Sequence, residues 1–126
     1  MTHNINKAIG IFDSGIGGLT VLKEIIQRLP KEDTVYLGDT ARVPYGTKSP
    51  ETVTRYSFEN TSFLLKHDIK LLVVACNTSS AISLKQIEKT LSIPVIGVLE
   101  PGAKAALKAT KSKRVGVIGT EATIGS

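Results

Sequence analysis

Short apolar runs alternate with longer amphipathic segments along the chain. The apolar runs are rich in Val and Ile and occupy residues 8–12, 34–38, 71–75, 94–98 and 114–119. Short runs that are largely apolar at successive positions, rather than at alternate ones, are typical of strands buried on both faces of a parallel sheet. The pattern therefore predicts five parallel strands.

The segments between these runs carry apolar residues at helical spacing, which predicts four helices. The four apolar stripes are Leu19, Leu22, Ile25, Ile26 and Leu29; Val53, Tyr56, Phe63 and Leu64; Ala81, Leu84, Ile87 and Leu91; and Ala103, Ala106 and Leu107. Ser49 followed by Pro50 is a typical helix start, with a capping side chain and then a proline at the first helical position. With right-handed crossovers, this alternation predicts an open, mostly parallel α/β sheet with helices on both faces.

The regular order breaks down near the end of the sequence. Only residues 120–126 follow the fifth apolar run, where a parallel sheet requires another covering helix. Two interpretations remain open: residues 120–126 form a loose tail, or the chain is a fragment of a longer protein.

Composition narrows the class of protein. A chain of 126 residues with 41% hydrophobic and 21% charged residues can bury one core, and it is neither disordered nor membrane-like. No apolar run is long enough to span a bilayer and the N-terminus lacks a secretory signal, so we expect a cytoplasmic protein without a membrane partner.

The chain has a formal charge of +5, with basic residues gathered near its end at Lys104, Lys108, Lys111, Lys113 and Arg114. Few aromatic residues lie among them and no nucleic-acid-binding motif is present, so a solvated helix face is the favoured interpretation. We expect no nucleic-acid partner. A modest positive field could still steer a small anionic substrate.

Polar residues and glycines directly follow the predicted strands. Ligands of open α/β sheets bind beyond the carboxyl ends of the strands, so we expect these residues to share one edge. They are Asp13, Ser14 and the glycines of DSGIGG; Asp39, Thr40 and then Pro44, Tyr45 and Gly46; Cys76, Asn77 and Thr78; Glu100; and Thr120 to Thr123.

Several of these residues have a purely structural interpretation as well. The glycines of DSGIGG suit either an anion-binding turn or close packing of a strand against a helix. Asp13, Ser14, Asn77 and Thr78 are all residue types that cap helices. Residues 44–46 form a typical turn sequence.

Cys76 is the only cysteine, so no internal disulfide can form. It lies between a buried strand and a helix start, where free N–H groups and the positive end of the helix dipole favour thiolate over thiol. This position favours a reactive thiol over a buried packing residue. The two histidines, His3 and His67, have no metal-ligand spacing, and we expect no metal site.

Five segments closely resemble the glutamate racemases of the aspartate/glutamate racemase family. They are GIFDSGIGGLTV, YLGDTARVPYG, VVACNTSSA, IPVIGVLEPGAKAA and VGVIGTEATI, in this order and with plausible gaps. The resemblance runs from about Ile9 to Ile124. It implies a cofactor-independent enzyme that interconverts L- and D-glutamate for peptidoglycan synthesis, and in which dimers are common.

The resemblance also implies roles for individual residues. Members of the family use two cysteines on opposite faces of the bound amino acid, one to remove the α-proton and one to donate a proton. Cys76 matches the first of these, and Asp13 matches a residue that assists it or the substrate ammonium. The positions matching the family's substrate-binding residues are Asp13, Ser14, Tyr45, Gly46, Asn77, Thr78, Thr120 and Thr123.

The sequence departs from the family in length. Family members have two similar α/β lobes, and their second cysteine, in a Cys-Thr-His segment, belongs to a part that would follow Ser126. We therefore expect residues 1–98 to form the first lobe, and residues 99–126 to be the opening helix and strand of a truncated second lobe. With one thiol, the chain alone is expected to be unable to complete racemisation.

Three alternative functions remain open. The chain could be a non-catalytic fragment or interaction module that keeps the fold, or it could derive from a racemase of a related amino acid such as aspartate. The motifs IFDSG and LGDT also faintly resemble phosphatases with an aspartate nucleophile. Those enzymes typically carry a second aspartate where this chain has Gly15.

Overall fold

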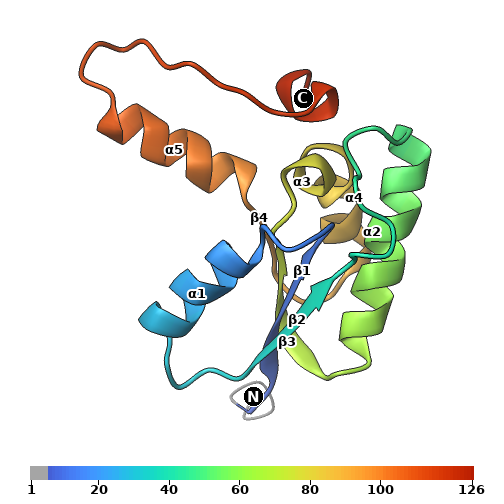
Figure 1. The fold of residues 1–126 in the computed structure, drawn as a ribbon. Helices are drawn as coiled ribbons and strands as arrows, with labels where there is room; N and C mark the ends of the chain where they lie inside the picture. The colour runs from blue at the N-terminus through green and yellow to red at the C-terminus, as the bar shows by residue number, and fades with distance from the viewer. Residues whose placement is uncertain (1–5) are drawn as a thin grey trace.

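The computed structural model describes residues 6–126, so His3 lies outside the described residues (Figure 1). This part of the chain forms a four-stranded sheet whose paired strands are all parallel, in the order β2-β1-β3-β4. The strands are β1 (Ala8–Asp13), β2 (Thr34–Gly38), β3 (Ile69–Val74) and β4 (Val95–Gly97). The helices are α1 (Leu19–Arg28), α2 (Pro50–Leu65), α3 (Asn77–Ile82), α4 (Leu84–Thr90), α5 (Leu99–Ala109) and α6 (Glu121–Ile124). The open parallel α/β architecture predicted from the sequence is confirmed.

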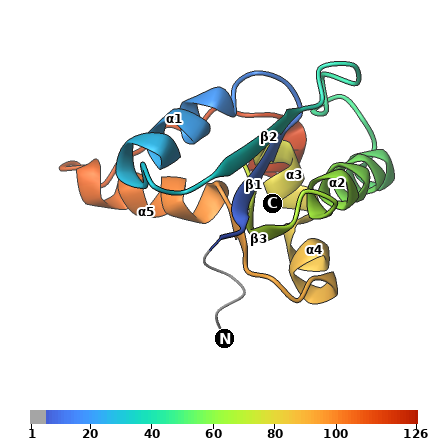
Figure 2. The same cartoon turned by 90° about the horizontal axis from the view of Figure 1, so that it is seen from below.

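The strands are apolar throughout because both faces of the sheet are covered. Ile9 and Ile11 of β1 point to the face covered by α1, where they join Val73 and Ala75. Phe12 points to the opposite face, where α2 and α4 pack over β3. Successive side chains of a strand alternate between faces, so a doubly covered strand has no position for a polar residue. Figure 2 shows α1 and α2 on opposite sides of the strands.

The start of α2 follows the sequence prediction. The Ser49 Oγ accepts a hydrogen bond from the Thr52 N–H at 3.2 Å, and Pro50 is the first helical residue. A serine at this position satisfies one of the N–H groups that have no partner within the helix.

Replacing Ser49 with alanine is expected to lower the free energy of unfolding by about 1 kcal/mol, because the Thr52 N–H loses its acceptor. Urea denaturation of the two proteins measures the difference. Ser49→Asp keeps a capping oxygen and should remain within about 0.5 kcal/mol of the original, in the range of ordinary surface substitutions. Equal losses for both variants would contradict the capping role.

The third predicted helix is divided. Its apolar stripe is carried by two short helices, α3 and α4, which meet at Ser83. The Ser83 hydroxyl is buried and donates to Thr54 of α2 at 3.4 Å. A single amphipathic stripe therefore predicted the helical state of this segment and missed the break.

The predicted fifth strand is wrong. Residues 115–119 have no regular secondary structure, and Val117 and Ile118 are 70% and 99% exposed. A strand is defined by hydrogen bonds to a neighbour, and this segment arches away from the sheet between α5 and α6 (Figure 1). Residues 120–126 are not a loose tail, because the Thr120 side chain caps α6 by accepting from the Thr123 N–H at 3.4 Å.

The expected second unit, residues 99–126, thus contains its opening helix, α5, but no strand. That these residues belong to a separate lobe stays a prediction. Within residues 6–126, no helix combines the length and the apolar character needed to cross a membrane.

Candidate functional site

The candidate site lies at the carboxyl ends of β1 and β3. These strands are neighbours, and the chain leaves β1 to form β2 on one side and β3 on the other. Such a reversal of strand order opens a crevice beyond the strand ends. The Ala75 N–H donates to the Phe12 carbonyl at 2.8 Å, which aligns the residues that follow each strand. As a result the Cys76 Sγ lies 3.5 Å from the Ser14 Oγ.

Cys76 is the capping residue of α3. Its Sγ accepts a hydrogen bond from the Ser79 N–H at 3.4 Å, so the alternative interpretation of Asn77 and Thr78 as caps of this helix does not hold. Those two residues are the first residues of the helix itself. The N–H donor and the positive end of the helix both stabilise negative charge on the sulfur.

The surroundings of Cys76 combine both interpretations of a lone cysteine. The residue is only 4% exposed and packs against Tyr45 and Val53, as a structural cysteine would. It also lines a cavity of about 1070 Å³, where it lies beside Asp13 and Asn77. Cys76 is therefore buried on one side and faces the crevice on the other.

Asp13 holds the turn between β1 and α1. Its Oδ2 accepts from the Gly18 N–H at 2.8 Å, and Gly18 is the cap residue of α1. A Cβ on Gly18 would lie 2.6 Å from the Asp13 Cβ, so this glycine serves close packing of the strand end against the helix. The Tyr36 hydroxyl donates to the Gly15 carbonyl at 3.2 Å. Burial and the negative charge of Asp13 raise the pKa of Tyr36, which keeps this donor protonated.

Threonines from α6 and its cap meet the start of α3 at the cavity. The Thr78 and Thr120 hydroxyls are 3.0 Å apart, and those of Thr120 and Thr123 are also 3.0 Å apart. The cavity thus brings together seven of the residues predicted from the sequence: Asp13, Ser14, Cys76, Asn77, Thr78, Thr120 and Thr123. Among residues 6–126, no three His, Cys, Asp or Glu side chains are grouped closely enough to hold a metal ion.

Tyr45 and Gly46 do not line this cavity. Tyr45 is 1% exposed, and its hydroxyl donates to Asp39 and accepts from Asn60, away from the crevice. Thr78, Thr120 and Thr123 form one side of the cavity, which we call the threonine wall. Gly46 packs against this wall from behind, since a Cβ on it would lie 2.3 Å from the Thr120 Cγ2. The sequence predicted a turn at residues 44–46, and the structure has one at residues 45–48, where the Lys48 N–H donates to the Tyr45 carbonyl at 3.0 Å.

The family described as Asp/Glu/Hydantoin racemase matches residues 9–126. The chain belongs to this family. It is 74% identical over 120 residues to the glutamate racemase of Geobacter metallireducens, a match that covers 95% of the chain and 44% of that relative.

Solved structures of family members superpose closely on this chain. The glutamate racemase of Bacillus anthracis has a TM-score of 0.90 at 54% identity, over 94% of this chain and 45% of that one. The glutamate racemase of Francisella tularensis, solved in complex with D-glutamate, has a TM-score of 0.85 at 44% identity, over 95% of this chain and 45% of that one. The chain spans less than half the length of these relatives.

Sequence reasoning missed two parts of the site. The first is Ser79, whose N–H reaches the Cys76 sulfur; its position three residues after a capping residue was the available signal. The second is the pair Arg42 and Asn60, which contact each other at 3.2 Å although they are far apart in the sequence. No local pattern links residues on a loop and a helix at such a separation.

Proposed function

We propose that this chain supplies one half of the active site of a cofactor-independent glutamate racemase, with Cys76 as one of two acid-base groups. The observation that carries the proposal is the placement of the Cys76 sulfur. It lies at the carboxyl edge of the sheet, 3.5 Å from Ser14 and 3.4 Å from the Ser79 N–H, in a cavity shared with Asp13 and Asn77. Membership of the racemase family supports it.

The chemistry requires a base on one face of the amino acid and an acid on the other. The α-proton of glutamate is very weakly acidic, so the site has to hold the base in reach and stabilise the carbanion-like state that forms. In the proposed step the Cys76 thiolate takes the α-proton of D-glutamate and becomes a thiol, and the electron pair stays on the α-carbon. A second acid then protonates that carbon from the opposite face, which completes the inversion.

The second acid has to come from outside these residues, because the 126-residue chain contains one cysteine. We propose that the cavity residues Asp13, Ser14, Asn77, Thr78, Thr120 and Thr123 hold the substrate ammonium and carboxylates, and that the Tyr45–Gly46 backbone, which lies behind the residues that line the cavity, contributes to substrate binding. Asp13 is proposed to assist Cys76 or the substrate ammonium.

The biological setting is proposed from the same family membership. A glutamate racemase supplies D-glutamate for peptidoglycan, acts in the cytoplasm and needs no cofactor. A homodimer is a further proposal. Glutamate is favoured over aspartate as substrate because the relatives that the chain matches at 74% and 54% identity are glutamate racemases.

The decisive test compares the chain alone with a completed enzyme. The chain is fused to the part of the Geobacter metallireducens relative that the match does not cover, which the 74% identity makes compatible. In D₂O, the fusion is expected to racemise D-glutamate with deuterium entering the α-carbon, whereas the chain alone yields no L-glutamate. Circular dichroism and NMR measure the two events. Turnover by the chain alone at a rate near that of the fusion would refute the two-base proposal.

Thiol alkylation separates a catalytic cysteine from a packing residue. Iodoacetamide is expected to modify Cys76 in the folded chain near neutral pH, and D-glutamate to slow the reaction in the fusion. Cys76→Ser provides the blank in the chain alone, which has no other thiol, and in the fusion it measures the modification of thiols in the added part. Modification that occurs only after unfolding would assign Cys76 to packing and favour a non-catalytic module. Protection by aspartate rather than glutamate would reassign the substrate.

A further inference from the structure

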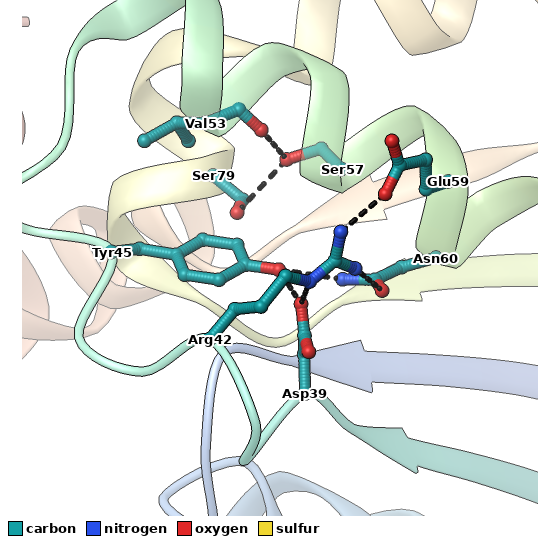
Figure 3. Close-up of polar contacts among 8 residues, drawn as sticks. All are labelled: Asp39, Arg42, Tyr45, Val53, Ser57, Glu59, Asn60 and Ser79. Carbon is teal, nitrogen blue, oxygen red and sulfur yellow. Dashed lines mark hydrogen bonds and ion pairs between the residues drawn. The ribbon is translucent and has the colours of Figure 1, made fainter.

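A buried polar network lies behind the cavity wall, between the loop after β2 and helix α2 (Figure 3). We call it the Tyr45 network and define it as Asp39, Arg42, Tyr45, Glu59 and Asn60. Tyr45 donates to the Asp39 carboxylate and accepts from the Asn60 Nδ2 at 2.9 Å. Arg42 pairs with Asp39 at 2.7 Å and with Glu59, and donates to the Asn60 Oδ1 at 3.2 Å.

The network has the features of a rigid anchor. Asp39, Tyr45 and Asn60 are 8%, 1% and 3% exposed, so bulk water has little access to them. Removing one partner from such a buried set leaves the others unsatisfied, which costs more than the bond itself contributes. Several polar side chains therefore hold Tyr45 in one position.

Tyr45 transmits this constraint to the site in two directions. Its ring packs in the same buried cluster as Cys76 and Val53. Its neighbour Gly46 is in such close contact with Thr120 that a Cβ would lie 2.3 Å from the threonine methyl group. The anchored ring thus supports the buried side of the sulfur and the back of the threonine wall.

Helix α2 also restrains the donor to the sulfur. The Ser57 hydroxyl donates to the Val53 carbonyl at 2.8 Å and is hydrogen-bonded to the Ser79 hydroxyl at 3.1 Å, as Figure 3 shows. Ser79 is the residue whose N–H reaches the Cys76 Sγ. One helix therefore fixes both the tyrosine behind the sulfur and the first turn of α3 in front of it.

Tyr45 itself is unsuited to acid-base work near neutral pH. Burial, together with its hydrogen bond to Asp39, raises the pKa of the phenol well above its ordinary value. The hydroxyl therefore remains a donor to Asp39. Its side chain acts on the site through position and not through proton transfer.

We propose that Asp39 and Asn60 are positioning residues, which lock Tyr45 as the rear wall of the Cys76 site and leave only the cavity side of the sulfur accessible. This deepens the proposed function, on which it rests for the role of Cys76. It assigns the Tyr45 side chain to support of the wall, so any contact of residues 45–46 with substrate comes from the backbone.

The test measures how closely Cys76 is enclosed, with two maleimides that share a reactive group and differ in size. Cys76 is the only thiol, so all incorporation reports on this site. Tyr45→Phe keeps the ring and removes the hydroxyl. It is expected to raise the ratio of the N-pyrenylmaleimide rate to the N-ethylmaleimide rate at least about fivefold, because the bonds to the Asp39 carboxylate and from Asn60 are both lost and a single neutral hydrogen bond already changes an equilibrium by about that factor.

A general loss of stability would also raise the ratio, because the unfolded chain admits both reagents alike, so the ratios are compared at equal free energies of unfolding, set with urea and checked by circular dichroism. Tyr56→Phe is the matched control. The Tyr56 ring lies 5.5 Å from the Tyr45 ring and 4.0 Å from the Arg42 guanidinium, but its hydroxyl takes no part in the network. Its ratio should equal that of the original chain. An unchanged ratio in Tyr45→Phe, or equal increases in both variants, would overturn the proposal.

Asn60→Ala provides a second variant that removes the 2.9 Å bond from the other side. It is expected to raise the ratio in the same direction, and the double variant should show less than the product of the two single effects, since both remove the same bond. If the two effects on the ratio multiply fully, Asn60 does not act on Cys76 through its bond to Tyr45, which would contradict the proposal. A Cys76 that reacts only in denaturant would instead defeat the proposed function, so the two failures are distinguishable.

Discussion

Replacing Cys76 with alanine in the completed fusion enzyme is expected to abolish racemisation, a loss of at least about 10²–10⁴-fold if the thiolate acts as general base. The sulfur faces the cavity and receives an N–H hydrogen bond from Ser79 at 3.4 Å, so it is placed to take the α-proton. Circular dichroism of D-glutamate solutions measures the rate. Deuterium entry at the α-carbon should fall with it.

Cys76→Ser is the matched control for the fold. A serine hydroxyl can still accept from the Ser79 N–H and cap α3, so stability should be retained. Activity should nevertheless fall greatly, because an alkoxide is far harder to form than a thiolate. Retention of more than a tenth of the activity by the alanine variant would remove Cys76 from the reaction.

Gly18→Ala is expected to lower the free energy of unfolding by about 1–3 kcal/mol, the usual cost of overpacking. The added Cβ would meet the Asp13 Cβ at 2.6 Å, the Tyr36 hydroxyl at 3.0 Å and the Ala75 Cβ at 3.1 Å. These neighbours belong to strands or to the strand end and cannot all move aside. Asp13 would be displaced from the Gly18 N–H, so activity of the fusion should fall as well. Urea denaturation measures the stability.

Gly102→Ala is the control for the same chemical change. Gly102 lies within α5, and nothing comes within 4 Å of an added Cβ. Alanine favours a helix over glycine, so this variant should be more stable by about 0.5–1 kcal/mol. The opposite signs of the two substitutions test the packing at Gly18. A neutral result for Gly18→Ala would show that α1 can shift away from the strand end.

Local sequence patterns predicted most of the helices and strands, but not which segments pair with each other. The Ser49 cap and the doubly covered strands follow from residue types at fixed spacings, and both are confirmed. Residues 114–119 have the composition of a strand, yet whether such a segment becomes one depends on a neighbour to pair with. Strand formation requires hydrogen bonds between two segments, and without such a neighbour Val117 and Ile118 remain exposed.

The location of the candidate site was predicted from the sequence, but the directions of its side chains were not. That polar residues gather at the carboxyl edge followed from the order of the strands, and the cavity contains Asp13, Cys76 and Thr120 together. The direction of each side chain did not follow. Tyr45 belongs to a motif that was predicted to lie at the crevice, but its hydroxyl is turned to Asp39 and Asn60.

The sequence by itself determined the parallel α/β class, the edge at which the chemistry gathers and the cysteine at its centre. These depend on spacing and on short stretches of chain. Only the tertiary structure decided that Cys76 caps α3, that Gly18 packs against Asp13 and that Tyr45 is anchored from α2. Each of these rests on hydrogen bonds and contacts set by three-dimensional packing, and a hydrogen bond forms only when the fold has brought both partners to within a few ångströms.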